Sequence, residues 1–311
     1  MTRYVYICSH RHSGSTLLDL LLGSHSRIES LGEISFLSQD LALNLPCTCG
    51  LRIRECTVWQ TVIDRLSAQL GTDIMANPYA LHLGYPLADV TVDRTHQTRA
   101  YRARRELMLG MYYLRMRFGA RFLDPLLGRM RRSFANNFRV YDAAREVLNA
   151  DLVVDSSKTY LKALGIYQQN PEQVRVILLT RDGRGVLYSN IRRKRSRNES
   201  VAGWVTQHTR ALPLFRQHIR PDHLLFVKYE AVTVDPAREM SRICRFLGVD
   251  FEPAMLDFTA KVHHSTDGNN MRLQRSASIR VDNQWMERLS ADDLRYFEQH
   301  AGWLNRELGY T

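Results

Sequence analysis

The stretch YVYICSHRHSGSTLLDLLL, residues 4–22, decides the fold of this chain. Its first five residues are mostly aromatic and β-branched, which is typical of a buried strand. Residues 9–14 are mostly polar and predict a turn. Ser15 and Thr16 then precede five leucines, so we expect a capped, strongly apolar helix to start there. The stretch therefore predicts a strand, a polar loop and a helix in direct succession.

Similar units recur later in the chain. The predicted strands are residues 152–155, 174–180 and 224–229, and a helix is predicted after each of them. Strands that alternate with helices indicate a parallel sheet with right-handed crossovers. We therefore predict an α/β fold with a parallel sheet of about five strands, flanked by helices. Ligands bind such sheets at the carboxyl ends of the strands, where the polar loops should meet.

Residues 59–149 carry no comparable strand signal. Arg, Leu, Met and Tyr recur there at helical spacing, for example in residues 99–116. We interpret this region as a helical cap inserted over the strand ends, within a single domain of residues 1–311. It contains no repeat or low-complexity segment, and it is the expected acceptor side of the molecule.

The composition narrows the class of partner and the compartment. The formal net charge is +11, and 38 of the 43 basic residues are arginines. Such a surplus favours anionic partners, although a genome rich in arginine codons would give the same composition. No long apolar run or secretory signal is present. The five cysteines are an odd number, which does not indicate a disulfide scaffold, so we expect a cytoplasmic protein.

The loop at residues 10–16, HRHSGST, predicts an anion-binding site. A polar loop that enters a helix N-terminus presents backbone N–H groups and the positive end of the helix dipole. Gly14 allows close approach of the backbone, and Ser15 and Thr16 add hydroxyl donors. The Gly-Lys-Ser/Thr ending of nucleotide-hydrolysing phosphate loops is absent. The alternative interpretation is an ordinary capped helix.

A second motif follows the predicted strand at residues 174–180. Arg181 lies at the strand end, and Ser189 lies about two helical turns further on. Arginine makes bidentate contacts to phosphate, so the pair suits a terminal phosphomonoester. Alone, the motif is equally consistent with a surface turn that holds a salt bridge.

The two motifs in this order resemble bacterial members of the sulfotransferase family, with motifs closest to the tyrosylprotein and carbohydrate types. Further matches are residues 30–33, 155–158, 161–162, 227–230, 235–236, 246–248 and 264–272. The resemblance implies a P-loop-like fold and 3′-phosphoadenosine 5′-phosphosulfate (PAPS) as the donor. It implies these donor-binding residues: Arg11, His12, Ser13, Gly14, Ser15, Thr16, Arg181, Ser189, Tyr229, Gly268, Asn269 and Arg272.

The resemblance also implies catalytic residues. Glu33 is the candidate base that takes the acceptor proton, and Lys158 is the candidate that stabilises the transferred group. The family usually has Arg or Lys directly before Ser-Gly, but here His12 occupies that position and Arg11 precedes it. His12 would supply positive charge to the leaving oxygen only when protonated. Alternative bases are His10, His25, His263 and His264. The leaving group is a stable anion, so the sequence predicts no metal requirement.

Cys47, Cys49 and Cys56 form a tight cluster in the sequence. Three thiolates and one histidine can hold zinc in a tetrahedral site. No suitably spaced histidine lies nearby in the sequence, so we expect structural thiols rather than a metal ligand set.

Two other classes of function fit parts of the sequence. A P-loop-type kinase would need a lysine at the end of the first loop and carboxylates for magnesium. A nucleic-acid-binding protein would fit the arginine surplus, but no recognisable reading motif is present. The expected partner is therefore a hydroxyl-bearing glycan, lipid or small molecule, and the arginine-rich residues 99–132 would suit an anionic one. The sequence indicates neither the acceptor nor the oligomeric state.

Overall fold

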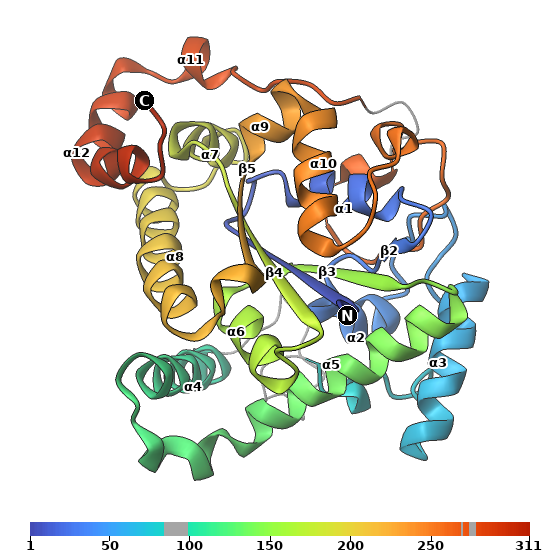
Figure 1. Ribbon diagram of the computed structural model, residues 1–311. Coiled ribbons are helices and arrows are strands. Elements are labelled where there is room, and N and C mark those ends of the chain that lie inside the picture. The colour runs from blue at the N-terminus through green and yellow to red at the C-terminus, as the bar shows by residue number, and fades with distance from the viewer. Residues whose placement is uncertain (84–98, 269, 274–277) are drawn as a thin grey trace.

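The computed structural model describes residues 1–83, 99–268, 270–273 and 278–311. The described residues contain a five-stranded sheet, in the order β2-β3-β1-β4-β5, whose neighbouring strands all pair in parallel (Figure 1). The strands are β1 (Tyr4–Ser9), β2 (Ile28–Ser30), β3 (Leu152–Lys158), β4 (Val174–Thr180) and β5 (Leu224–Lys228). The predicted α/β class and the prediction of about five parallel strands are confirmed.

The strand bounds differ from the prediction mainly at the carboxyl ends. β3 continues to Lys158, beyond the predicted end at residue 155, because Lys158 still pairs with Cys8 of β1 after a shift in register. β5 ends at Lys228, and Tyr229 instead begins α9 (Tyr229–Val234). The short edge strand β2 was not predicted, since only Ile28 of its three residues is apolar.

Helices cover both faces of the sheet. Along β1, the side chains of Val5 and Ile7 join one apolar cluster, and those of Tyr4, Tyr6 and Cys8 join the other. Because both faces are buried, β1 is a continuous apolar run, as expected of a central parallel strand. The other helices of this architecture are α1 (Ser15–Gly23), α2 (Leu37–Ala42), α6 (Tyr160–Gln169), α7 (Gly183–Ile191), α8 (Arg197–His218), α10 (Pro236–Leu247), α11 (Trp285–Arg288) and α12 (Ala291–Glu307).

Helix α1 follows the first loop and packs with α10 on the face of Val5 and Ile7. Its five leucines are all buried, which explains why this helix is apolar all round. Its N-cap is Gly14, in a left-handed conformation and without a side-chain capping bond. The expected capping role of Ser15 and Thr16 is therefore wrong, because both residues already lie inside the helix.

The described parts of residues 59–149 are mainly helical. They contain α4 (Arg99–Phe118), α5 (Gly128–Val147) and most of α3 (Thr57–Leu70), and no strand is assigned in residues 59–83 or 99–149. Helix α5 packs on the face of the sheet that carries Tyr4 and Tyr6, because its apolar stripe includes Phe134 and Tyr141. This helix therefore covers a sheet face, not the strand ends as expected of a cap.

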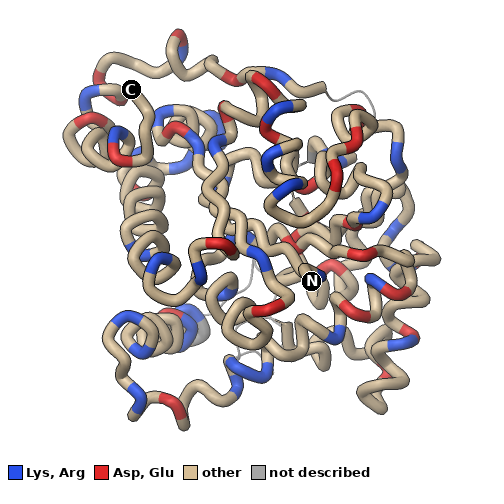
Figure 2. Tube along the Cα trace, viewed as in Figure 1, with Lys and Arg blue, Asp and Glu red and all other residues tan. Residues whose placement is uncertain are grey.

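The distribution of charge is mixed. Basic and acidic residues are spread over much of the trace in Figure 2, and α4 is mostly basic. Among the described residues, no helix is both long enough and apolar enough to cross a lipid bilayer.

Candidate functional site

The loop between β1 and α1 lies at the carboxyl edge of the sheet. His12 and Gly14 both have positive φ, 63° and 86°, so the chain turns sharply on either side of Ser13. Backbone of this kind collects N–H groups into a concave surface that suits an anion. The buried atoms Ser13 Oγ and His12 Nε2 have no hydrogen-bond partner within the described part of the chain. Such orphaned polar atoms beside a helix N-terminus fit a bound phosphate or sulfonate oxygen.

Gly14, Tyr229 and Arg181 form a stack beside this loop. A Cβ on Gly14 would lie 2.1 Å from Cδ2 of Tyr229, so only glycine lets the ring pack on the loop backbone. The Arg181 guanidinium lies over the Tyr229 ring, 4.6 Å from the ring centroid. Arg181 Nη1 donates to the His12 carbonyl at 2.9 Å, and Nη2 donates to Asp282 Oδ2 at 2.9 Å. The sequence motifs at three strand ends thus meet at one place.

Ser189 lies in α7 and is buried, and its carbonyl accepts a hydrogen bond from Arg193 Nη1 at 3.1 Å. Arg181 runs along the first turn of this helix, since a Cβ on Gly185 would lie 3.1 Å from Arg181 Nε. The hydrogen bonds of the described residues do not connect Arg181 with Ser189 directly. Arg181 therefore packs on the helix that contains Ser189. Its ion-pair partner in this structure is Asp282.

His12 is held neutral near pH 7. Burial, together with the positive charges of Arg193 and Arg195, lowers its pKa to about 4. Those two arginines belong to the basic run at residues 192–197, which is exposed except at Arg197. The positive charge of this run also acts on the first loop. Sequence reasoning missed this effect on His12 because the basic run lies far from the first loop in the sequence.

Glu33 and Lys158 form an ion pair at the ends of β2 and β3. Gly32, at φ 75°, turns the chain so that Glu33 follows directly after the edge strand. Lys158 is the last residue of β3 and has a left-handed backbone, φ 73°, at which its chain leaves the sheet. Both side chains are mostly buried. The two predicted catalytic residues are therefore brought together, 125 positions apart in the sequence.

The other residues of the 155–162 motif support Lys158. Asp155 is buried, accepts a hydrogen bond from the Tyr141 hydroxyl and lies 3.5 Å from Lys162 Nζ. Lys162 Nζ also donates to Ser35 Oγ at 2.8 Å. This buried network ties β3 to the chain just after Glu33.

Asp19 is an acidic group that the sequence motifs did not single out. It lies in α1 among leucines and is buried. Burial raises its pKa to about 7, although hydrogen bonds from Ser30 and Ser156 and the charge of Lys158 favour its ionised form. A carboxyl group with a pKa near neutrality beside Lys158 is a second candidate proton acceptor. The available signal was a lone aspartate inside the run LLDLLL.

The segment at residues 263–268 closes over this edge from the C-terminal part of the chain. Thr266 pairs with Gly32, and the Glu33 N–H donates to the Thr266 carbonyl at 3.3 Å. A Cβ on Gly268 would lie 3.5 Å from Thr16 Oγ1 and 4.0 Å from Glu33 Oε1. Gly268 is thus beside both the loop and the candidate base.

Two other predicted residues of the C-terminal loop have different outcomes. Arg272 Nη2 donates to the Pro46 carbonyl at 3.0 Å, and Nη1 donates to Thr48 Oγ1 at 3.3 Å, so its guanidinium contacts the chain near Cys47. Asn269 lies outside the described residues.

The alternative histidine bases take structural positions. His25 and His263 lie beside the C-terminal end of α1, where His25 bonds the Asp250 carbonyl and His263 contacts Ser24. His264 contacts Cys56. His10 belongs to the first loop, but burial lowers its pKa to about 3 and its Nδ1 is bonded to the Arg11 carbonyl. A base with so low a pKa would accept a proton poorly.

A pocket of about 240 Å³ lies elsewhere, between α4, α5, α6 and α8. Its lining includes Gln168 and Gln169, at the C-terminal end of α6. That helix starts after the carboxyl end of β3 and ends before the amino end of β4. The pocket therefore lies toward the opposite edge of the sheet from the Glu33–Lys158 pair.

Comparisons with known proteins show the family of this chain. The model of the sulfotransferase family matches residues 85–253, which include Lys158, Arg181, Ser189 and Tyr229. A Caenorhabditis briggsae protein that carries the name protein-tyrosine sulfotransferase is 28% identical over 149 residues, 43% of this chain. The chain covers only 51%, about half, of the length of that relative.

Solved structures with similar chains were also found. A sulfotransferase domain of the Synechococcus PCC 7002 olefin synthase is 20% identical, with a TM-score of 0.48, over 100% of this chain and 95% of that one. A sulfotransferase domain of the curacin biosynthetic pathway is 17% identical, with a TM-score of 0.49, over 96% and 97%. A mouse sulfotransferase complexed with PAP is 10% identical, with a TM-score of 0.46, over 98% and 88%.

The family model matches more than half of the chain. This chain belongs to the sulfotransferase family. The resemblance drawn from the motifs is therefore confirmed.

Proposed function

We propose that this protein transfers the sulfonate group of PAPS to a hydroxyl group of its acceptor, by in-line displacement at sulfur. The observation that carries the proposal is the meeting of an anion-binding loop, residues 10–14, with the Glu33–Lys158 pair at one edge of the sheet. Family membership supports sulfonate transfer in general. The donor, the acceptor class and the residue roles are our inference, as is the assignment of residues 1–311 to one catalytic domain.

In this proposal the loop binds the donor's 5′-phosphosulfate through its backbone N–H groups, Ser13, Ser15 and Thr16. Arg181 and Ser189 bind the 3′-phosphate, and Arg181 exchanges Asp282 for that phosphate when the donor enters. Tyr229 supports Arg181, whose guanidinium it contacts. Gly268 and Arg272, with Asn269, complete the donor site from the C-terminal side.

The chemical step uses the Glu33–Lys158 pair. The acceptor oxygen forms a bond to sulfur while its proton passes to the Glu33 carboxylate. The bond from sulfur to the phosphate oxygen breaks, and its electron pair remains on adenosine 3′,5′-bisphosphate. Lys158 is paired with Glu33 beforehand and stabilises the sulfonate oxygens during transfer. The leaving group is already a stable anion, so this step requires no metal.

His12 takes a modified role in this scheme. With a pKa near 4 it is neutral at pH 7, so in the free protein it offers an N–H donor to the departing oxygen rather than a full positive charge. The positive charge then comes from Arg11, Arg193 and Arg195, whose effect on His12 shows that they lie close enough to act on the loop.

The acceptor is proposed to bind through residues 59–149. Exposed arginines in this region, among them Arg102, Arg104, Arg129 and Arg132, favour an anionic glycan or lipid headgroup. A small phenol or alcohol has the same reactive hydroxyl. Screening of sulfated and unsulfated glycans against phenols separates these classes.

A nucleotide-binding comparison tests the donor. Adenosine 3′,5′-bisphosphate should stabilise the protein far more than AMP, by about 2.7 kcal/mol at a hundredfold excess over Kd. Thermal unfolding in the presence of each nucleotide, of ATP and of a DNA duplex measures this. Equal shifts with the bisphosphate and AMP would remove the 3′-phosphate site. A larger shift with ATP would favour a kinase, and a strongly salt-dependent shift with DNA would favour nucleic-acid binding.

A further inference from the structure

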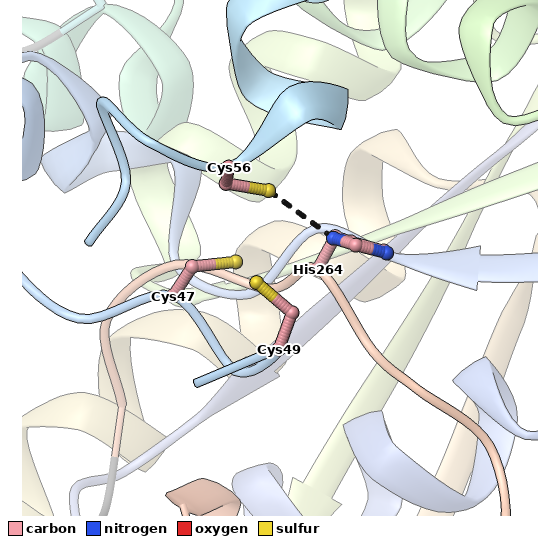
Figure 3. A group of neighbouring side chains, drawn as sticks. All are labelled: Cys47, Cys49, Cys56 and His264. Atoms are coloured by element: carbon pink, nitrogen blue, oxygen red, sulfur yellow. Dashed lines mark hydrogen bonds between the residues drawn. The ribbon is translucent and has the colours of Figure 1, made fainter. Parts of the chain in front are cut away.

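Three cysteines and one histidine gather where the chain after α2 meets the segment at residues 263–268. The ligand atoms of Cys47, Cys49, Cys56 and His264 all lie within 4.8 Å of one another. His264 Nδ1 is 3.2 Å from Cys56 Sγ. The four side chains point toward a common space in Figure 3. The histidine missing from the cysteine motif is therefore supplied from 208 positions further along the chain.

The backbone presents the three sulfurs in a compact turn. The Cys47 N–H donates to the Leu51 carbonyl at 2.8 Å, and the Gly50 N–H returns to the Cys47 carbonyl at 3.0 Å. Gly50 has a φ of 97°, a conformation that glycine adopts without steric cost. Cys56 then stands at the N-cap position of α3. Its N–H donates to the Arg52 carbonyl at 3.0 Å, which fixes it against the same turn.

His264 is held by bonds that leave its ring available. The Trp59 indole N–H donates to the His264 carbonyl at 2.7 Å. The Thr48 N–H and hydroxyl both donate to the neighbouring Ser265 carbonyl, at 3.3 Å and 2.8 Å. The backbone on either side of the imidazole is thus tied to the cysteine turn, and Nδ1 faces the sulfurs.

We propose that Cys47, Cys49, Cys56 and His264 bind one structural Zn²⁺ ion in a tetrahedral Cys₃His site. Zinc–sulfur bonds of about 2.3 Å place two sulfurs about 3.8 Å apart in a tetrahedron, which the cluster reaches with small side-chain shifts. Four protein ligands leave no open position, so the site is structural rather than catalytic. Binding converts the thiols to thiolates and releases their protons to solvent.

The surroundings suit the charge of such a site. Three thiolates, a neutral imidazole and Zn²⁺ carry a net charge of about −1. Arg272 donates to the Pro46 carbonyl and to Thr48 Oγ1, on the two residues that flank Cys47. Its guanidinium therefore places a positive charge beside the cluster. Cys47 and Cys56 are fully buried, which protects the metal from exchange with solvent ligands.

The consequence of the site lies in the segment that carries His264. That segment pairs with Gly32 through Thr266 and brings Gly268 beside Thr16 and Glu33. Zinc would therefore fasten this part of the site to the turn at residues 47–56. It would act by holding the segment in place and would not touch the reacting atoms.

Metal analysis of the full chain tests the proposal directly. Protein purified without a metal-binding tag, under reducing conditions, should contain about one zinc per chain by mass spectrometry of the metal. Replacement by Co²⁺ should give a thiolate-to-cobalt charge-transfer band and the intense visible bands of tetrahedral cobalt. Wild-type protein that holds no zinc, both as purified and after reconstitution with zinc under reducing conditions, would overturn the proposal. So would an octahedral cobalt spectrum.

Matched variants locate the ligands. Changes to the residues that support metal ligands typically weaken metal binding by about 10–100-fold. Cys49→Ala and His264→Asn remove proposed ligands themselves, so they should weaken zinc binding by more than that. Cys244→Ala removes a buried cysteine outside the cluster and should retain the metal. Competition with a chromophoric chelator measures each affinity. Equal affinity of all three variants and the wild type would reject the site, and the wild-type cobalt spectrum decides the matter if a variant does not fold.

Amide hydrogen exchange tests the role in the segment. Chelation of zinc should speed exchange at the amides of Glu33 and Thr266, which bond across the two segments. Amides of α12 should be unchanged. Unchanged exchange at Glu33 and Thr266 after complete metal removal would contradict the role in holding the segment. The readout needs neither donor nor acceptor, so it is independent of the proposed transfer reaction.

Discussion

The loop at residues 10–14 and the segment at residues 263–268 reach the same edge of the sheet but are fixed by different means. The loop joins a buried strand to a buried helix, and its shape depends on left-handed backbone at His12 and Gly14. The segment lies in neither a helix nor a strand of the sheet. It takes its position through bonds to residues 31–59, more than 200 positions earlier in the chain.

This difference has an energetic consequence. The loop is held at both ends by elements whose leucines and β1 residues are fully buried, each worth about 1.5–3 kcal/mol. The segment depends on a few hydrogen bonds, each worth about 0.5–1.5 kcal/mol. The loop should therefore keep its structure when the segment detaches, whereas the segment should detach when a single long-range contact is lost. Four substitutions test this comparison and the chemistry proposed for it.

The largest effect is expected at Glu33, which bonds Thr266 of the segment and is paired with Lys158. Glu33→Gln should lower kcat by about 10²–10⁴ because the amide cannot take the acceptor proton. The donor Kd should change little, because Glu33 is not one of the proposed donor contacts. Sulfonate transfer to an acceptor found by screening measures kcat, and calorimetry measures the donor Kd.

Glu29 offers the matched control. It lies on β2, and its Oε1 is paired with Lys261 Nζ at 2.8 Å, so Glu29→Gln also breaks a Glu–Lys pair. This variant should retain kcat. If Glu33→Gln kept near-wild-type kcat while Asp19→Asn lost it, the base would be Asp19.

The next effect separates the segment from the loop. Gly32→Ala puts a Cβ 1.9 Å from the Thr266 carbonyl oxygen and forces a non-glycine residue to a φ of 75°. We expect the free energy of unfolding to fall by about 2–4 kcal/mol, from backbone strain and lost hydrogen bonds. Exchange at the Thr266 amide should rise more than exchange in β1. Urea unfolding and hydrogen exchange measure the two effects.

Gly71→Ala is the control for backbone strain. Gly71 has a φ of 62°, and nothing lies within 4 Å of its added Cβ. It should cost only about 1–2 kcal/mol. Equal losses in the two variants would show that the contact between Gly32 and Thr266 contributes nothing.

The same comparison explains what the sequence could predict. The loop was predictable because strand, turn and helix signals are contiguous, and the alternating units gave the parallel sheet. The proximity of Glu33 to Lys158 was reached only through the family resemblance. The cysteine–histidine cluster was missed because its fourth member lies far away in the sequence and no local pattern links it to Cys47. Asp19 was passed over because its pKa depends on burial that only packing creates.

The loop itself is tested through Arg181. This residue is 5% exposed, and it bonds the His12 carbonyl and stacks on Tyr229. Arg181→Ala should weaken donor binding by about 1.5–3 kcal/mol, or about 10- to 150-fold in Kd, because a charge-assisted phosphate contact is lost. Titration calorimetry with adenosine 3′,5′-bisphosphate measures this.

Arg184 provides a close control for that change. It lies in the same βα turn, pairs with Asp182 and stacks on Trp285 at 4.2 Å from the ring centroid, away from the loop. Arg184→Ala should leave the Kd unchanged. A donor Kd that is the same for Arg181→Ala and the wild type would make Arg181 a structural residue.

The smallest effect concerns the pH dependence of the free energy of unfolding, which we test at a buried histidine close to the loop. His208, in α8, is 0% exposed and donates from Nδ1 to the Trp204 carbonyl at 2.8 Å. Burial lowers its pKa to about 4, and it lies close enough to His10 of the loop to lower the pKa of His10.

The sign of the pH effect follows from these values. A histidine kept neutral in the folded state binds a proton more readily when unfolded, where its pKa is about 6.5. Its contribution to stability is therefore complete above about pH 6.5 and is lost as the pH falls toward 4. The opposite sign applies to Asp19, whose raised pKa favours the folded state at low pH. The net pH dependence of the wild type mixes the two, so the test must be a difference between variants.

His208→Asn should reduce the loss of unfolding free energy between about pH 7.5 and about pH 5 by about 1–2 kcal/mol relative to the wild type. The asparagine retains a donor near the position of Nδ1 but does not titrate. His300→Asn is the matched control, because His300 makes the same 2.8 Å bond to the carbonyl four residues earlier in α12 but is exposed. Urea unfolding at both pH values gives the slopes. If His208→Asn and His300→Asn change the pH dependence equally, burial of neutral His208 contributes nothing to the pH dependence of stability. In that case acid should destabilise the segment and the loop to the same extent.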